Sequence, residues 1–128
     1  MIKAYYVNPA TNTAEARDID PELDTYYRLL DCDTIDIVNR GFGRGGRRRF
    51  DIICDDEGLY KTDPLISAID DLGRPMLVGA LLVTGVADDK GELTSLTDDD
   101  VRLLTRYTVH LGTRLHPKGW KMLTSMSY

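Results

Sequence analysis

The sequence has little of what marks membrane, secreted or disulfide-bonded proteins. Its two cysteines, Cys32 and Cys54, are 22 positions apart and match no metal or redox motif. The longest apolar run, residues 76–86, is interrupted by two glycines and a threonine, whereas a helix that spans a bilayer needs about 20 residues. The first nine residues lack the apolar core of a signal peptide. We therefore expect a cytoplasmic protein of a reducing compartment, with no membrane partner.

Residues suited to catalysis or metal binding are also scarce. Of the two histidines, His110 falls near the end of a predicted helix, where the helix dipole favours a partly cationic imidazole, and His116 precedes a proline. No serine or cysteine lies in a recognisable nucleophile setting, and the aspartate pairs match no calcium-loop spacing. We expect a protein that is not an enzyme and that uses neither a cofactor nor a metal.

The length and composition are those of one folded domain. A chain of 128 residues can bury a single core, and 42% hydrophobic with 29% charged residues is ordinary for a globular protein. We expect one domain over residues 1–128, in which residues 113–128 form either a short strand or helix packed on the domain or a less regular tail. The net charge of −5 argues against a general nucleic-acid binder, because such proteins carry a basic surface that neutralises phosphates.

Hydrophobic periodicity predicts an α+β fold. Alternating or continuous apolar runs predict five strands, at residues 2–7, 13–19, 34–39, 47–54 and 77–86. Apolar stripes and end signals predict three helices, at residues 20–30, 63–71 and 97–111. We expect a mainly antiparallel sheet of about five strands, with two or three helices packed largely on one of its faces.

Capping residues mark the predicted helix starts. Asp20 and Asp63 each precede a proline, which is the order of an N-cap residue and a first helical residue. Thr97 and Asp100 have the spacing of a capping box, in which each side chain accepts a hydrogen bond from the backbone of the other. Residues 55–60 are expected to turn the chain and then to resume strand pairing.

The most unusual feature is a cluster of arginines around a glycine-rich stretch, here named the arginine loop (residues 40–49). Five of the eleven arginines lie in it: Arg40, Arg44, Arg47, Arg48 and Arg49. The intervening GFGRGG matches the glycine spacing of dinucleotide-binding loops, but that motif must open a helix, and here a strand is predicted to follow. We therefore interpret the stretch as a hairpin loop.

These five arginines are the candidate binding site. Their guanidiniums can hold phosphates or carboxylates in bidentate fashion, and glycine lets a partner approach the backbone closely. The alternative is a solvated loop whose arginines form weak surface pairs with nearby aspartates. We favour the binding site, because so dense a cluster repels itself and usually has an anionic neighbour or partner. Trp120, the single tryptophan, is a further candidate as an apolar anchor for a protein partner.

The 17 aspartates suggest a second idea, imitation of the charge spacing of DNA. Mimicry requires acids on one face. Here the acids at residues 55–56 and 88–89 fall in predicted turns, and those at residues 98–100 begin a predicted helix, so each has a local structural role. DNA mimicry is thus the less favoured interpretation of the acidic residues.

Several stretches together resemble a known family. They are ICDDEGL at residues 53–59, residues 64–68, LVGALLVTG at residues 77–85 and GELTSLTDDDV at residues 91–101. They are similar to the domain-of-unknown-function family 3846, whose members occur in bacteriophages, plasmids and the bacteria that carry them. No activity is established for that family, so the resemblance implies no catalytic positions. The arginine loop and the tail after Gly112 depart from the common pattern.

Three functions remain as expectations. The first is an accessory protein of a phage or other mobile element that binds a host or defence protein, for example as an inhibitor of a CRISPR complex (an anti-CRISPR) or of a restriction complex. The second is an accessory protein that contacts nucleic acid through the arginine loop, whose affinity would fall steeply with salt. The third, an enzyme or small-ligand protein, has little support. The sequence leaves the oligomeric state open.

Overall fold

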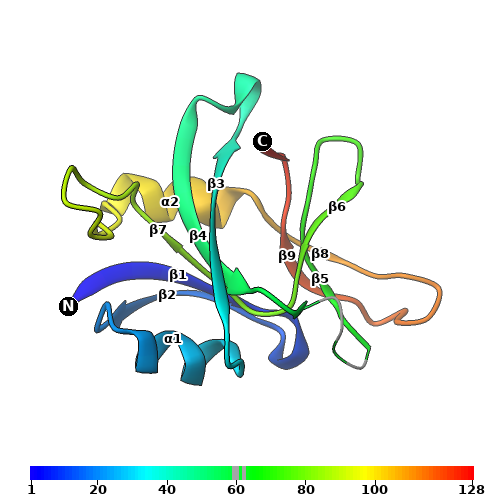
Figure 1. Cartoon of the computed structure of the whole chain (residues 1–128). Helices are drawn as coiled ribbons and strands as arrows, with labels where there is room; N and C mark the ends of the chain where they lie inside the picture. The colour runs from blue at the N-terminus through cyan, green and yellow to red at the C-terminus, as the bar shows by residue number, and fades with distance from the viewer. Residues whose placement is uncertain (59–60, 62) are drawn as a thin grey trace.

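The computed structural model describes residues 1–58, 61 and 63–128. Within these ranges the chain forms two α-helices, two short 3₁₀ helices and ten strands (Figure 1). The helices are α1 (Leu23–Leu30) and α2 (Asp98–Arg106), and the 3₁₀ helices are η1 (Pro9–Thr11) and η2 (Arg44–Gly46). The strands are β1 (Ile2–Asn8), β2 (Thr13–Ile19), β3 (Ile35–Phe42), β4 (Arg48–Asp55), β5 (Ile66–Ile69), β6 (Pro75–Val78), β7 (Leu81–Thr84), β8 (Thr108–Leu111), β9 (Trp120–Leu123) and β10 (Met126–Ser127).

The strands form two sheets. A six-stranded sheet has the order β10-β3-β4-β7-β1-β2, and a four-stranded sheet has the order β6-β5-β9-β8. All pairings are antiparallel except that of β5 with β9. The predicted α+β class and antiparallel character are confirmed, but the prediction of a single sheet of about five strands is wrong. The run at residues 77–86 is divided between the sheets because Gly79, with a φ of 76°, breaks it into β6 and β7.

The two helices cover opposite faces of the six-stranded sheet. Successive residues of a strand point to opposite faces, so Tyr5 and Val7 join a core with Leu104 of α2, whereas Tyr6 joins a core with Leu30 of α1. Figure 1 shows α2 above and α1 below β1 and β2. The expectation of helices largely on one face is therefore wrong. The central strands are apolar on both faces, and each face needs a cover.

The predicted capping box is confirmed, and the predicted length of its helix is wrong. The Asp100 N–H donates to the Thr97 hydroxyl at 3.1 Å, and the Thr97 N–H donates to the Asp100 carboxylate at 2.9 Å. The helix ends at Arg106 instead of residue 111, because residues 108–111 pair with β9 as strand β8. Helix α1 likewise starts later than predicted: Glu22, not Asp20, precedes its first residue.

The helix predicted at residues 63–71 is a strand. Asp63 has a φ of 53°, which is not the extended conformation of an N-cap residue. Strand β5 pairs with β6, and its Ala68 lies opposite Leu123 of β9, 55 positions along the chain. The pairing with these two strands overrides the local helix signal. The strand pairing expected at residues 59 and 60 lies outside the described residues.

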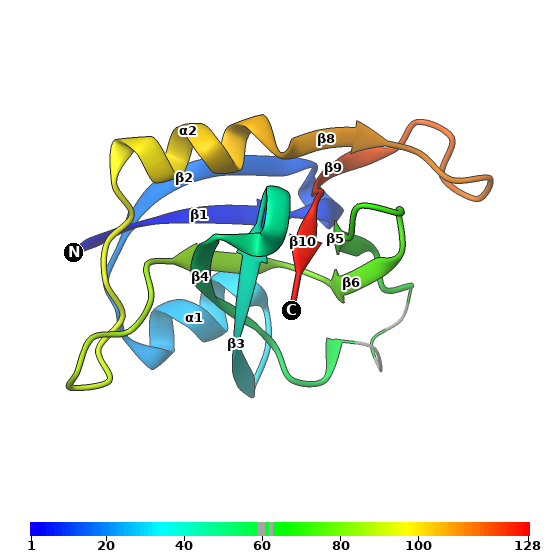
Figure 2. The ribbon, with the colours of Figure 1, turned by 90° about the horizontal axis from the view of Figure 1, so that it is seen from above.

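Of the two alternatives for the tail, the packed strand is the one found, because the tail contributes a strand to each sheet (Figure 2). Strand β9 lies inside the four-stranded sheet and buries Leu123 completely, and β10 pairs with the end of β3. Residues 112–119, between β8 and β9, form the longest stretch of the tail outside regular structure. In the described part of the chain, no helix is both long enough and apolar enough to cross a membrane.

Candidate functional site

The arginine loop closes a long hairpin that projects from the body of the molecule (Figure 1). Strands β3 and β4 pair without interruption from Ile35–Asp55 to Phe42–Arg48. The turn between them needs positive φ at three glycines: 80° at Gly43, 74° at Gly45 and 62° at Gly46. Strand β4 follows directly, so these glycines open a strand, as the sequence predicted, and not a helix that holds a pyrophosphate.

Two of the five arginines are held at the base of the loop by the end of the chain. Arg49 donates from Nε to the Asn39 side-chain oxygen and from Nη1 to the Tyr128 carbonyl oxygen, both at 2.8 Å. The Arg40 guanidinium lies 4.6 Å from the centre of the Tyr128 ring and donates to the Asn39 carbonyl at 2.9 Å. A cation over an aromatic face and a hydrogen bond together fix its position. Both side chains thus have structural partners.

A third arginine joins the hairpin to α2. The Arg48 guanidinium forms an ion pair with the Asp100 carboxylate, which is 14% exposed and also closes the capping box of α2. The Asp100 carboxylate therefore makes two interactions, a hydrogen bond that caps α2 and an ion pair with the arginine loop. This is the surface pairing that the alternative interpretation of the loop expected, and it applies to one arginine.

Arg44 and Arg47 remain. Both are exposed, and neither forms a hydrogen bond or ion pair with any other residue that the structure describes. Gly45, between them, adds no side chain to cover the backbone. The Tyr107 hydroxyl lies beside the loop, 3.0 Å from where a Cβ on Gly43 would be. The end of the hairpin therefore presents two guanidiniums, and the Tyr107 phenol lies beside Gly43.

Trp120 is not the exposed anchor that the sequence suggested. It is 5% exposed, packs with Ile69 and Met122, and donates its indole N–H to the Ile66 carbonyl. The sequence signal was the residue type alone, and tryptophan serves cores as readily as interfaces. The predicted site thus does not come together: Trp120 belongs to the core of the four-stranded sheet, and the arginines belong to the hairpin of the larger one.

The two histidines lie near Trp120. His110 is on β8 and not at a helix end, and its Nε2 is 2.7 Å from the Lys118 carbonyl oxygen. The His116 ring packs edge-on against Trp120 with centres 5.4 Å apart, and its Nε2 is 3.6 Å from the Asp63 carboxylate. Among the described residues, no three histidine, cysteine or acidic side chains gather as metal ligands would.

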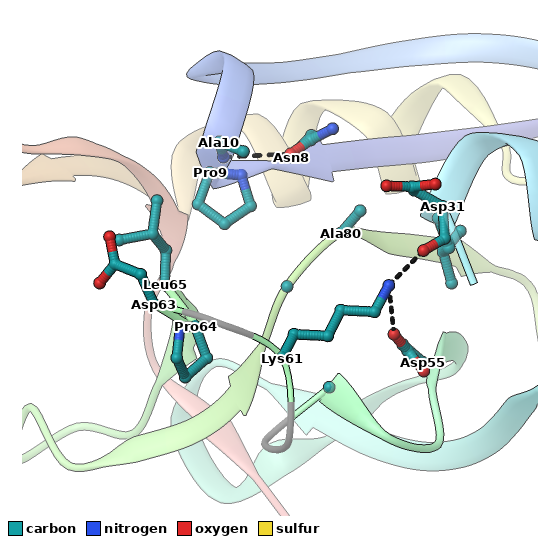
Figure 3. A pocket seen from close by; sticks show the side chains of 13 residues that line it. Asn8, Pro9, Ala10, Asp31, Asp55, Lys61, Asp63, Pro64, Leu65 and Ala80 are labelled. Atoms are coloured by element: carbon teal, nitrogen blue, oxygen red, sulfur yellow. Dashed lines mark hydrogen bonds and ion pairs between the residues drawn. The ribbon is translucent and has the colours of Figure 1, made fainter.

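A cavity of about 290 Å³ lies beside the turn after β4, and no sequence pattern predicted it (Figure 3). Lys61 extends across it, 2.8 Å from the Asp55 carboxylate, and donates also to the Asp31 carbonyl. The hydrogen bond to Asp55 raises the pKa of Lys61, so its amine stays protonated and is a poor nucleophile. Pro9, Leu65 and other apolar residues form the opposite wall. The lysine is used within the chain to neutralise a nearly buried carboxylate.

The two cysteines are free, and the pKa of each thiol is raised. Burial raises the pKa of Cys54 to about 11, and burial also raises the pKa of Cys32. Since the thiolate is the reactive form, both shifts lower the reactivity of these cysteines near neutral pH.

Comparison with known proteins gives one result. A family model described as Domain of unknown function (DUF3846) matches residues 2–110, which include the arginine loop and end before β9 and β10. Searches of the curated proteins and of the solved structures gave no match. The resemblance seen in the sequence is confirmed, and the chain belongs to the DUF3846 family of domains of unknown function.

Proposed function

We propose that this chain is a cytoplasmic accessory protein of a mobile genetic element and acts by binding a host or defence protein through its arginine loop. The supporting observation is the pair Arg44 and Arg47, which are exposed and unpaired within the described structure at the end of a projecting hairpin. The loop is held in place by the contacts of Arg48 and Arg49. A fixed loop loses little conformational freedom on binding, which favours affinity.

A protein partner suits this loop better than nucleic acid. The nucleic-acid alternative needs several arginines for phosphates, but Arg48 and Arg49 are already engaged within the chain. Two remaining cations release few counterions, and the net charge of −5 opposes the approach of a polyanion. Two guanidiniums fit a pair of carboxylates on a folded partner, each through a bidentate hydrogen-bonded pair.

The narrower form of the proposal is inhibition of a CRISPR or restriction complex, with no enzymatic step by this chain. The cavity that contains Lys61 does not favour an enzyme, because its ammonium and the Asp55 carboxylate neutralise each other. A purified nuclease complex that lost activity upon stoichiometric addition of the chain would support this narrower form.

The test is affinity capture from nuclease-treated lysate of a host bacterium, with the double variant R44A/R47A against a matched control. The control is R28A/R102A, which removes two exposed arginines from α1 and α2. It therefore has the same net charge as R44A/R47A. We expect one stoichiometric protein with the wild type and the control, and about a tenfold loss of it with R44A/R47A, as for an interfacial charge pair.

Two results would contradict the proposal. A protein captured equally by R44A/R47A would place the contact elsewhere on the chain. Recovery of nucleic acid from untreated lysate, with no protein after nuclease treatment, would favour the second function. In that case the binding constant should fall with salt, and with a shallower slope in R44A/R47A.

A further inference from the structure

The charges of the chain are divided unevenly along its length. All 21 acidic residues lie at or before Asp100, so residues 101–128 contain none. The same stretch carries five lysines and arginines: Arg102, Arg106, Arg114, Lys118 and Lys121. A chain with a net charge of −5 therefore ends in a basic segment, and three of these cations lie in or beside the loop between β8 and β9.

This β8–β9 loop (residues 112–119) is ordered by its own hydrogen bonds. The Thr113 N–H and the Gly119 N–H both donate to the His116 carbonyl, at 3.1 and 2.9 Å. His110 on β8 bonds to the Lys118 carbonyl, which ties the far side of the loop to the strand. Gly119 has a φ of 68° and lies so close to Leu111 that a side chain would overlap its carbonyl. The loop is thus an ordered, hydrogen-bonded turn between two strands.

The loop is also fastened to the rest of the molecule. His116 contacts Trp120 through its ring and Asp63 through Nε2. Beside it, the Lys121 N–H donates to the Asn12 side-chain oxygen at 2.7 Å, which joins β9 to the turn between β1 and β2. Figure 2 shows the loop at the end of the molecule away from the N-terminus and clear of the arginine loop.

An apolar side chain stands out on this ordered loop. Leu115 is 88% exposed, the most exposed large apolar residue of the described chain. It borders a hollow of about 440 Å³ between the loop and the β1–β2 turn, and a neighbouring hollow of about 330 Å³. Leu65 and Trp120 line both hollows, and Pro117 lines the larger one. Arg114 and Lys118 are exposed at the same loop, so cations border the apolar walls.

We propose that the β8–β9 loop is a second docking surface, for a short segment of a partner protein in which apolar side chains are flanked by acidic ones. The hollows supply apolar walls, and Arg114 and Lys118 supply cations for the flanking carboxylates. A membrane surface fits less well, because insertion needs a broad apolar face and this loop offers Leu115 alone beside its charges. The surface uses no residue of the arginine loop and does not depend on the function proposed for it.

The test uses a blocked peptide of sequence EDLLDE as the probe and its counterpart KKLLKK as the matched control. Trp120, the one tryptophan, lines the hollows, so its fluorescence and its indole N–H resonance report on their occupancy. We expect EDLLDE to bind and KKLLKK not to bind. L115A and the double variant R114E/K118E should each weaken EDLLDE about tenfold, and R28A/R102A, whose arginines lie on α1 and α2, should leave it unchanged.

These variants keep the fold, because the substituted side chains are exposed, and an unchanged melting temperature checks this. Equal binding of the two peptides would overturn the proposal, and so would EDLLDE binding that neither L115A nor R114E/K118E weakens. Binding to vesicles of phosphatidylglycerol without binding to EDLLDE would overturn it in favour of a membrane. Loss of peptide binding in L115A with undiminished lysate capture would show that the two surfaces act separately.

Discussion

The molecule has two basic regions, and they differ in how their charges are balanced. In the arginine loop, Arg48 pairs with an aspartate and two further arginines are held by Asn39 and Tyr128. In the β8–β9 loop, Arg114 and Lys118 form no ion pair with the residues that the structure describes. The arginine loop, whose cations are close together in the sequence, therefore has most of them paired within the chain. The cations of the β8–β9 loop are fewer and are not paired within the described structure. Charge density along a sequence is a poor measure of charge that is available to a partner.

The two regions also rest on different supports. The arginine loop ends a hairpin of the six-stranded sheet and is braced by α2 and β10. The β8–β9 loop ends a shorter hairpin in the four-stranded sheet, whose small apolar cluster is built around Trp120. Stability in the second region thus depends on few residues. This difference leads to three predictions on stability.

The largest effect is expected from Trp120→Ala. It removes the most voluminous side chain of the small cluster and leaves the Ile66 carbonyl without its indole donor. We expect a loss of about 3–5 kcal/mol in the free energy of unfolding, measured by urea denaturation. Trp120→Phe, which keeps an aromatic ring but not the N–H, should lose about 1–2 kcal/mol. A loss below about 1 kcal/mol for the alanine variant would mean that the β8–β9 region does not depend on this residue.

A smaller effect is expected from glycine substitutions, and it should distinguish the two loops. Gly119 and Gly46 both have positive φ, but a Cβ at Gly119 would overlap backbone, whereas one at Gly46 would meet the Ser127 hydroxyl. The Ser127 side chain can rotate away from an added methyl group, whereas the Leu111 backbone cannot. We expect Gly119→Ala to lose about 2–4 kcal/mol and Gly46→Ala about 1–2 kcal/mol.

The controls separate backbone strain from overlap. Gly91 has a φ of 78° and open space around it, so Gly91→Ala should lose about 1 kcal/mol from strain alone. Adding Ser127→Ala to Gly46→Ala should recover any loss beyond that value. Equal losses at Gly119 and Gly46 would mean that both loops are equally deformable, contrary to the comparison.

Local signals predicted some of this fold well. The hairpin at the start of the chain and the capping box of Thr97 and Asp100 were predicted because their partners lie within a few residues. Strand β5 was predicted as a helix because Asp63 and its proline imitate a helix start, whereas the segment pairs with β6 on one side and with β9 on the other. Pairing within a sheet overrode the local helix signal, so propensity alone predicted the wrong element.

The candidate site was likewise predictable where it depends on local sequence and not where it depends on distant contacts. The arginine cluster was evident from composition, and the glycines predicted a hairpin loop correctly. The engagement of Arg40 and Arg49 by Tyr128 depends on β10 returning to the edge of β3 and was not predictable. The exposure of Leu115 was not predictable either, because a single leucine between polar residues does not indicate whether its loop packs on the molecule or projects from it.

The smallest effect concerns the paired and unpaired cations themselves. Arg48→Ala removes an ion pair with a carboxylate that is mostly buried, although the arginine side chain is 49% exposed and therefore well screened. We expect a loss of about 0.5–1 kcal/mol, which shrinks in 1 M salt. Lys118→Ala in the other loop, and Arg44→Ala in the same loop, should each change stability by less than about 0.5 kcal/mol.

Arg44→Ala is the decisive control, because Arg44 and Arg48 belong to one loop and carry the same charge. If cluster density governed stability, removing either arginine would relieve the same repulsion, and the two variants would behave alike. If pairing governs it, only Arg48→Ala loses stability, since only Arg48 contacts Asp100. A measured loss for Arg44→Ala as large as that for Arg48→Ala would show that Arg44 is engaged in solution. The arginine loop would then have one fewer cation for a partner than its geometry indicates.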